Sequence, residues 1–228
     1  MDITTTPEWA ALQAVPRPAH LRELFAADPE RAARYTTVVG DLRVDWSKNL
    51  IDDAVPPSAD DLRSMPYQFP MPAESLPDIV VPHAIPEDER VWVPQAENVW
   101  FRPLCLNRSA GYWMNLLRVR RSGILSRHRH SLPVHGFVLK GRWRYLEHDW
   151  VATEGSYVFE PPGETHTLVV PDDVAEMITF FQVNGVMYYV DPWGKGVGFE
   201  DVFIKIDMCR KHYAEVGLGA DYVDQFIR

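Results

Sequence analysis

The chain has 228 residues, enough for one domain of ordinary size with an additional segment. Its formal net charge at pH 7 is −9 and it has no run of basic residues, which argues against nucleic-acid binding. The two cysteines, Cys105 and Cys209, lack the spacing of a metal site, and no apolar run approaches the roughly 18 residues that a membrane span needs. We therefore expect a cytoplasmic protein with neither a nucleic-acid nor a membrane partner.

The first 55 residues predict two helices followed by a hairpin. Thr6 and Asp28 each precede a proline, which is typical of the start of a helix. The segment TTVVGDLRVDW then alternates polar and apolar residues around Gly40 and Asp41. This alternation predicts two short strands joined by a tight turn.

The rest of the chain predicts a mainly β domain that ends in helices. Residues 56–78 are rich in proline and form an extended linker, because proline disfavours helix. In the domain of residues 79–228, short apolar runs separated by turn residues are typical of a sandwich or barrel. The expected strands are residues 112–119, 137–140, 143–146, 157–160, 166–169, 177–182 and 186–190.

The last 30 residues change to a helical period. The apolar residues Val202, Phe203, Ile206 and Tyr213 recur every three to four positions, which predicts an amphipathic helix that stops at Gly217. A short helix at residues 221–227 follows.

Three histidines form the candidate metal site. His128 and His130 are two positions apart, so in a strand their side chains point to the same face. The turn at residues 161–163, Pro-Pro-Gly, delivers His166 at the start of the next apolar run. An isolated pair of this kind is equally compatible with two surface histidines, but a third histidine after a tight turn favours a metal.

Two further residues are candidates for a fourth ligand or for a hydrogen bond to a ligand. The first is His135, which is alternatively an ordinary strand residue. The second is Glu160, directly before the turn, which alternatively points outward.

Aromatic residues on the flanking strands are candidates for a substrate pocket, although only about half of them can face inward because side chains alternate. These candidates are Trp113, Phe137, Tyr145 and Phe180. Arg118, Arg120 and Arg142 are candidates for recognising a phenolate or carboxylate, although exposed strand arginines are more common.

The residues around these histidines resemble the two motifs of the cupin superfamily. The second motif, G(x)5PxG(x)2H, is matched at its fixed positions by Gly155, Pro161, Gly163 and His166. The first motif has two histidines, then four residues and an acid, and here His135 stands in the acid position. The segments GYWMNLLRVRRSGILSRHRH, VHGFVLKGRWRYLEHDWV and EGSYVFEPPGETHTLVVP resemble the 2,4'-dihydroxyacetophenone dioxygenases, a similarity that extends from about residue 76 to residue 228.

This resemblance implies a double-stranded cupin β-barrel, or jelly roll, in a homodimer or homotetramer. It implies a non-haem Fe(II) enzyme that uses O2 to cleave the bond between the ketone carbon and the hydroxymethyl carbon of a small aryl ketone, giving 4-hydroxybenzoate and formate. Three neutral imidazoles leave the charge of a divalent ion uncancelled, which would attract an anionic substrate. The alternative is a zinc-binding cupin that acts as a sensor or interaction module, since zinc has no redox chemistry.

The segment HLRELFAADPERAARYTTVVGDLRVDWSKNLI resembles the beginning of the bacterial glucose-6-phosphate isomerases. The catalytic residues of that family lie beyond this segment. The resemblance therefore implies a non-catalytic α+β appendage, and it makes isomerase activity the weakest of the three hypotheses.

Overall fold

The computed structural model describes residues 5, 10, 20–45, 48 and 63–228. The chain consists of two compact units, Met1–Pro72 and Ala73–Arg228. The boundary between them falls inside the predicted proline-rich linker. The helix start predicted at Thr6 lies outside the described residues.

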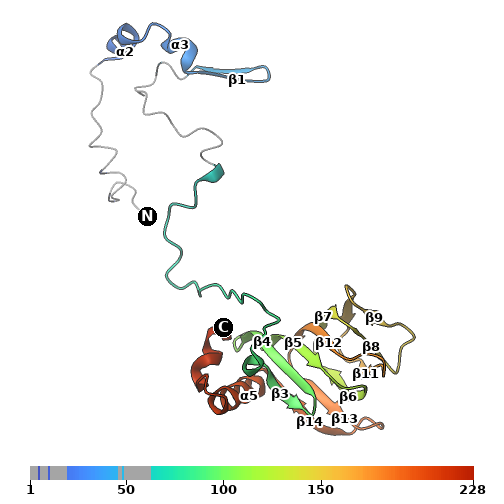
Figure 1. Ribbon diagram of the computed structural model, residues 1–228. Helices are drawn as coiled ribbons and strands as arrows, with labels where there is room; N and C mark the ends of the chain where they lie inside the picture. Colours follow the sequence, from blue (N-terminus) through green and yellow to red (C-terminus); the bar gives the residue numbers. More distant parts are fainter. Residues whose placement is uncertain (1–4, 6–9, 11–19, 46–47, 49–62) are drawn as a thin grey trace. The chain divides into compact units, whose positions relative to one another are not determined.

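Residues 20–45 of the first unit form two short helices and a hairpin (Figure 1). The helices are α2 (Leu21–Ala27) and α3 (Arg31–Arg34), and the hairpin consists of β1 (Thr36–Val39) and β2 (Leu42–Asp45). Gly40 has a φ of 59°, the left-handed conformation that a tight turn between paired strands requires. The predicted turn is confirmed.

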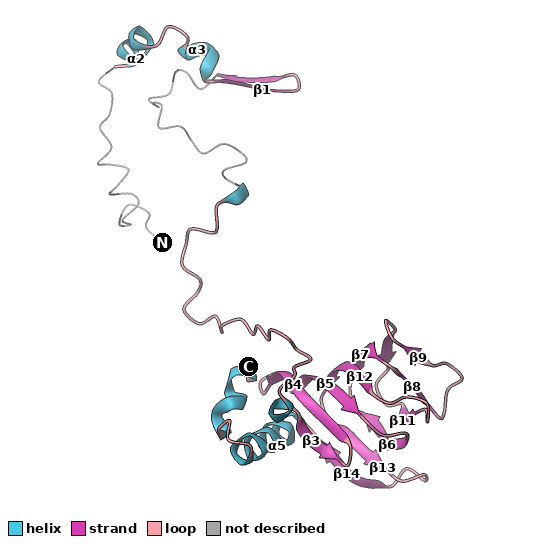
Figure 2. Ribbon diagram, viewed as in Figure 1, coloured by secondary structure: helices cyan, strands magenta, loops and turns pink. Residues whose placement is uncertain are grey.

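The second unit is a jelly roll of two six-stranded sheets (Figure 2). The first sheet has the order β10-β7-β12-β5-β4-β3 and the second has the order β14-β13-β6-β11-β8-β9, with antiparallel pairing throughout. The strands of the first sheet are β3 (Val93–Ala96), β4 (Val99–Asn107), β5 (Tyr112–Val119), β7 (Val134–Lys140), β10 (Tyr157–Glu160) and β12 (Met177–Asn184). Those of the second sheet are β6 (Gly123–His130), β8 (Arg142–Tyr145), β9 (Ala152–Thr153), β11 (Thr165–Val170), β13 (Met187–Val190) and β14 (Gly196–Glu200).

Strand alternation places the core between the two sheets. On β12 the side chains of Met177, Thr179 and Phe181 are buried on the inner face, whereas Ile178 is buried in a separate cluster with Trp92 and Leu116. Trp143 from β8 packs against this face, and its Nε1 donates a hydrogen bond to Thr179 Oγ1 at 3.0 Å. The inner faces of the two sheets therefore supply both the core and the wall of any cavity between them.

A C-terminal helix, α5 (Val202–Glu215), is capped by Asp201, whose carboxylate accepts a hydrogen bond from the backbone N–H of Ile204 at 2.9 Å. Its buried side chains are Val202, Lys205, Ile206, Cys209 and Tyr213. Phe203 is exposed, which corrects its place on the predicted apolar face. A 3-10 helix, η3 (Ala220–Phe226), follows α5.

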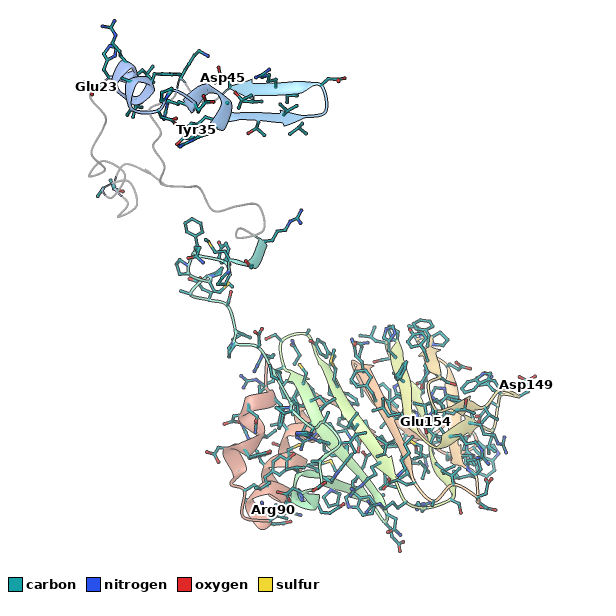
Figure 3. The ribbon with its side chains drawn as sticks, turned by 45° about the horizontal axis from the view of Figure 1, so that its top comes forward. Glu23, Tyr35, Asp45, Arg90, Asp149 and Glu154 are labelled. Carbon is teal, nitrogen blue, oxygen red and sulfur yellow. The ribbon has the colours of Figure 1, made fainter. Side chains whose placement is uncertain are left out.

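The predicted mainly β jelly roll with C-terminal helices is confirmed. A short 3-10 helix, η2 (Glu89–Val91), lies against α5, where His212 Nε2 is 2.9 Å from the carbonyl oxygen of Arg90. Figure 3 shows Arg90 at this helical end of the unit and Asp149 at the opposite end. Among the described residues, no helix is long and apolar enough to cross a membrane.

Two glycines in the loops of the second unit provide a matched test of backbone packing. Gly141 has a φ of +72°, and a Cβ added there would lie 2.5 Å from the backbone oxygen of Glu176. Gly155 has a φ of +84°, and a Cβ there would meet nothing within 4 Å. Alanine at either position destabilises the fold by about 1 kcal/mol, because a residue with a Cβ rarely adopts a left-handed φ. Only Gly141→Ala also forces the backbone to move, since its Cβ would clash with the oxygen of Glu176.

We therefore expect Gly141→Ala to lower the free energy of unfolding by about 3 kcal/mol and Gly155→Ala to lower it by about 1 kcal/mol. Urea denaturation of the wild type and both variants measures this difference. Equal losses would show that the contact with Glu176 does not limit the packing of the turn.

Candidate metal centre

Neighbouring strands β6 and β11 bring the three histidines together. His128 and His130 are buried on the inner face of β6, whereas Arg129 between them is exposed. His166 on β11 is directly opposite His128 in the antiparallel register, and the Nε2 atoms of these two residues are 3.2 Å apart. The backbone N–H of Gly163 donates to the carbonyl oxygen of His130 at 2.8 Å, so the turn before β11 is closed onto β6.

A buried carboxylate completes this group. Glu160 lies at the end of β10, on the opposite sheet, and is only 2% exposed. Its Oε2 atom is 3.2 Å from His130 Nε2 and 3.4 Å from His166 Nε2, and its Oε1 atom accepts a hydrogen bond from the hydroxyl of Tyr145. The four potential ligand atoms, one from each of His128, His130, Glu160 and His166, all lie within 4.8 Å of one another.

Burial sets the protonation of these side chains. It lowers the pKa of His128 well below its usual value, with a further contribution from the neighbouring imidazoles, and it lowers the pKa of His166. Burial alone would raise the pKa of Glu160, but the adjacent imidazoles of His130 and His166 and the hydroxyl of Tyr145 outweigh burial and lower it. Burial and the adjacent Glu160 raise the pKa of Tyr145 well above its usual value. The lowered pKa values favour neutral imidazoles at His128 and His166 and an ionised carboxylate at Glu160, and Tyr145 retains the proton that it donates.

These side chains fit a divalent metal ion. Within the described part of the chain, Glu160 Oε2 is buried and makes no hydrogen bond, although it faces two imidazole nitrogens. A buried carboxylate oxygen without a donor is costly unless a cation compensates its charge. His128 Nδ1 lies 2.9 Å from Ser126 Oγ, which leaves His128 Nε2 directed at the group. Three nitrogen donors and one oxygen donor suit Fe(II), Zn, Cu or Ni.

The structure corrects the prediction for His135. On β7, Val134 and Gly136 are buried, so His135 between them points to the outer face of the first sheet. There its Nδ1 lies 2.8 Å from the hydroxyl of Tyr157, and it does not join the metal-ligand group. Glu160 supplies the acid instead. Because that carboxylate contributes one negative charge, the expectation that the site leaves the charge of a divalent ion uncancelled is also corrected.

A cavity of about 480 Å³ opens beside this group, between the two sheets. Its wall includes His128, His130 and Glu160, together with two of the predicted pocket residues, Trp113 and Tyr145. The metal-ligand group therefore has space beside it for a small molecule.

The other two predicted pocket residues lie outside the cavity. Phe137 is 43% exposed on the outer face of β7. Phe180 is on the outer face of β12 and packs with the small cluster around Trp92, whereas its neighbour Phe181 lines the cavity. The physical reason is strand alternation, which turns only one of two consecutive residues inward.

The three arginines considered for anion recognition are held in ion pairs away from the cavity. Arg118 lies 2.6 Å from Glu89, and Arg120 lies 2.6 Å from Glu176. Arg142 pairs with Asp173. None of the three lines the cavity.

Several polar residues of the cavity wall were not identified from the sequence, among them Gln95, Tyr189, Glu200 and Lys205. The sequence contained one signal for them. Lys205 lies on the same face of α5 as Val202 and Ile206, and a lysine on an apolar face is buried only when it is paired.

The second unit is similar to known cupin proteins in sequence and in structure. Residues 81–187 match the family model described as the ChrR cupin-like domain. An RmlC-like cupin protein from Ralstonia eutropha JMP134 is 28% identical, with a TM-score of 0.53 over 55% of this chain and 83% of that chain. A putative acetylacetone dioxygenase from Methylibium petroleiphilum PM1 is 17% identical, with a TM-score of 0.51 over 60% of this chain and 97% of that chain, and this is a similarity of fold.

A second similarity covers a short stretch of the chain. The chain is 59% identical over 56 residues to glucose-6-phosphate isomerase 1 of Streptomyces avermitilis. The matched stretch is 22% of this chain and 10% of that enzyme. The chain is also 56% identical over 52 residues to glucose-6-phosphate isomerase 1 of Streptomyces coelicolor, and this match is 21% of this chain and 9% of that enzyme. The chain therefore spans about a tenth of the length of these curated relatives, and the predicted resemblance to the isomerases is confirmed.

We expect the purified protein to bind one divalent metal ion per chain at the group of His128, His130, Glu160 and His166. His166→Ala should lose most of this metal, because it removes one of four ligands from a buried site. His135→Ala is the matched control, since it makes the same change on the outer face of the barrel. Metal content by mass spectrometry after dialysis measures both, and full retention by His166→Ala would contradict the site.

Tyr145→Phe should raise the metal dissociation constant by about tenfold to a hundredfold, because it removes the hydroxyl that holds Glu160. The ring of Tyr145 stacks on that of His166 with centroids 3.8 Å apart, and phenylalanine preserves this contact. Tyr157→Phe is the control, since its hydroxyl contacts His135 on the outer face. Competition with a chelator measures the affinity, and equal affinities in both variants would show that Tyr145 does not position Glu160.

Proposed function

Since residues 81–187 of the chain form a cupin-like domain, we propose that the protein is a non-haem Fe(II) dioxygenase that cleaves the C–C bond beside an aryl ketone. The model reaction converts 2,4'-dihydroxyacetophenone and O2 to 4-hydroxybenzoate and formate. The observation that carries the proposal is the buried group of three histidines and one glutamate in the wall of a cavity lined by aromatic side chains. The resemblance of residues 76–228 to the 2,4'-dihydroxyacetophenone dioxygenases supports the choice of reaction.

The side chains of His128, His130, His166 and Glu160 would hold the iron. When bound, ferrous iron supplies one-electron activation of O2 and Lewis-acid polarisation of the ketone oxygen. Tyr145 keeps one oxygen of Glu160 engaged, so the other oxygen faces the histidines. The stacked rings of Tyr145 and His166 fix the orientation of that imidazole.

Apolar side chains of the cavity isolate the reacting groups from water. Leu117, Leu125, Leu168 and Val183 line the same space as the metal-ligand group. In such an environment, electrostatic interactions with a bound ketone are stronger than in water, and competing hydrolysis is suppressed. The apolar wall also favours a substrate with an aromatic ring.

A second candidate function is a zinc-binding cupin that acts as a sensor or interaction module. The observation that favours it is the donor set, because three nitrogen atoms and one oxygen atom complete the four-coordinate shell that is typical of structural zinc. The adjoining cavity favours the enzyme instead, since a site that only holds zinc needs no open volume at its ligands.

The proposed enzyme is a homo-oligomer, a dimer or a tetramer. Phe137, Tyr157 and Phe159 are exposed on the outer face of the paired strands β7 and β10. An exposed aromatic surface of this kind supports self-association, because burial of aromatic area drives assembly.

We expect the Fe(II)-loaded protein to consume O2 with 2,4'-dihydroxyacetophenone in equal proportion to the 4-hydroxybenzoate and formate that it releases. An oxygen electrode and chromatography of the same sample measure the three quantities. Zinc-loaded protein should show no uptake, because zinc has no redox chemistry. His128→Ala should fall to the background rate, whereas His135→Ala should remain active.

Full iron occupancy without oxygen uptake would reject this reaction and favour the second candidate. Unchanged turnover in His128→Ala would instead show that the reaction takes place elsewhere in the chain.

A further inference from the structure

A second polar cluster lies in the wall of the same cavity, separate from the metal-ligand group. Lys205 of α5 is 2% exposed, and its ammonium group lies 2.8 Å from Glu200 Oε2 and 3.0 Å from Gln95 Oε1. The side-chain amide of Gln95 donates to Glu200 Oε2 and to the hydroxyl of Tyr189, each at 3.3 Å. Four side chains from α5, β14, β3 and β13 therefore converge on one part of the cavity.

The buried lysine is costly for a purely structural contact. A lysine is rarely buried, and an apolar side chain between a helix and a sheet is generally at least as stabilising as a buried ion pair. Lys205 Nζ also lies 4.3 Å from the ring centroid of Phe101 and 5.9 Å from that of Trp113. An ammonium group has three N–H donors, and Glu200 and Gln95 engage two of them. The third is available to a molecule in the cavity that Lys205 lines.

The strand register places this cluster at a fixed separation from the metal-ligand group. Glu200 on β14 pairs with Met187 on β13, which pairs in turn with His130 on β6. Neighbouring strands are about 4.8 Å apart, so the backbones of Glu200 and His130 are separated by roughly 10 Å. The two polar groups therefore line different parts of one cavity, with Trp113 and other apolar side chains in the same wall.

We propose that Lys205, Glu200, Gln95 and Tyr189 bind a hydroxyl group on the end of the substrate's aromatic ring that is remote from the ketone. This inference rests on the proposed function, since a para-hydroxyphenyl ketone presents one oxygen at each end of a rigid ring. A phenolic hydroxyl both donates and accepts, which matches the Glu200 carboxylate and the Lys205 ammonium.

The charge of the cluster selects a hydroxyl over a carboxylate. Lys205 and Glu200 form an ion pair without net charge, so a carboxylate on the ring would meet the negative charge of Glu200 without an excess positive charge to compensate it. Burial and the adjacent Glu200 raise the pKa of Tyr189, so its hydroxyl keeps its proton and remains a donor. The cluster therefore offers both donors and an acceptor to a neutral ring hydroxyl.

The test is isothermal titration calorimetry of the Fe(II)-loaded protein without oxygen, using three ketones that lack the 2-hydroxyl group. We expect 4'-hydroxyacetophenone to bind about tenfold to a hundredfold more tightly than acetophenone, the range for a hydrogen bond to a charged group. The third ketone, 4-acetylbenzoate, should bind no more tightly than acetophenone. Lys205→Met should abolish the preference for the hydroxyl, so that 4'-hydroxyacetophenone and acetophenone bind with similar affinity.

Lys211→Met is the matched control, because it makes the same substitution at an exposed position of the same helix, and it should keep the preference. Tyr189→Phe removes only one hydroxyl and should reduce the preference, so it decides the question if Lys205→Met does not fold. Equal affinities of the wild type for the first two ketones, tighter binding of 4-acetylbenzoate, or a preference that survives both substitutions would overturn the proposal.

The binding experiment and the oxygen-uptake experiment can fail separately, so they distinguish the hydroxyl site from the proposed reaction. A protein that prefers 4'-hydroxyacetophenone but consumes no oxygen with 2,4'-dihydroxyacetophenone has the hydroxyl site and is not this dioxygenase. A protein that consumes oxygen without that preference is the dioxygenase and lacks the hydroxyl site.

Discussion

The meeting of one buried carboxylate with three buried imidazoles is the constraint on which the rest of the second unit depends. Glu160 comes from one sheet and the histidines come from the other, so the group exists only when the two sheets have closed. An unpaired buried carboxylate costs several kcal/mol. The hydroxyl of Tyr145 and the neighbouring imidazoles offset this cost, and a bound cation would offset more of it.

The cavity combines two kinds of polar wall with apolar side chains. Nitrogen and carboxylate donors on β6, β11 and β10 suit a metal ion, whereas Lys205 and Glu200 form a neutral pair on α5 and β14. The proposed chemistry and recognition thus use different strands. Within the second sheet, β13 separates Glu200 on β14 from the histidines on β6 and β11. The helix α5 is part of this arrangement, because it carries a charged side chain into the cavity as well as apolar side chains into the core.

The two units of the chain differ in what they contribute to the proposed site. All four residues of the metal-ligand group and all four residues of the proposed hydroxyl site belong to Ala73–Arg228. The isomerase resemblance therefore supplies no catalytic group to the proposed dioxygenase.

The sequence by itself determined the elements that depend on local spacing. The strands at residues 112–119 and 157–160 were predicted with their observed bounds, and the pairing of His128 with His130 on one face followed from the period of a strand. Only the tertiary structure decided which face of a strand is inside. Local alternation says that His135 and Phe137 share a face, and that Phe180 and Phe181 do not, but the opposing sheet selects the buried face. The same holds for Glu160 and Lys205, because their partners are distant in sequence and meet them only when the sheets and α5 pack together.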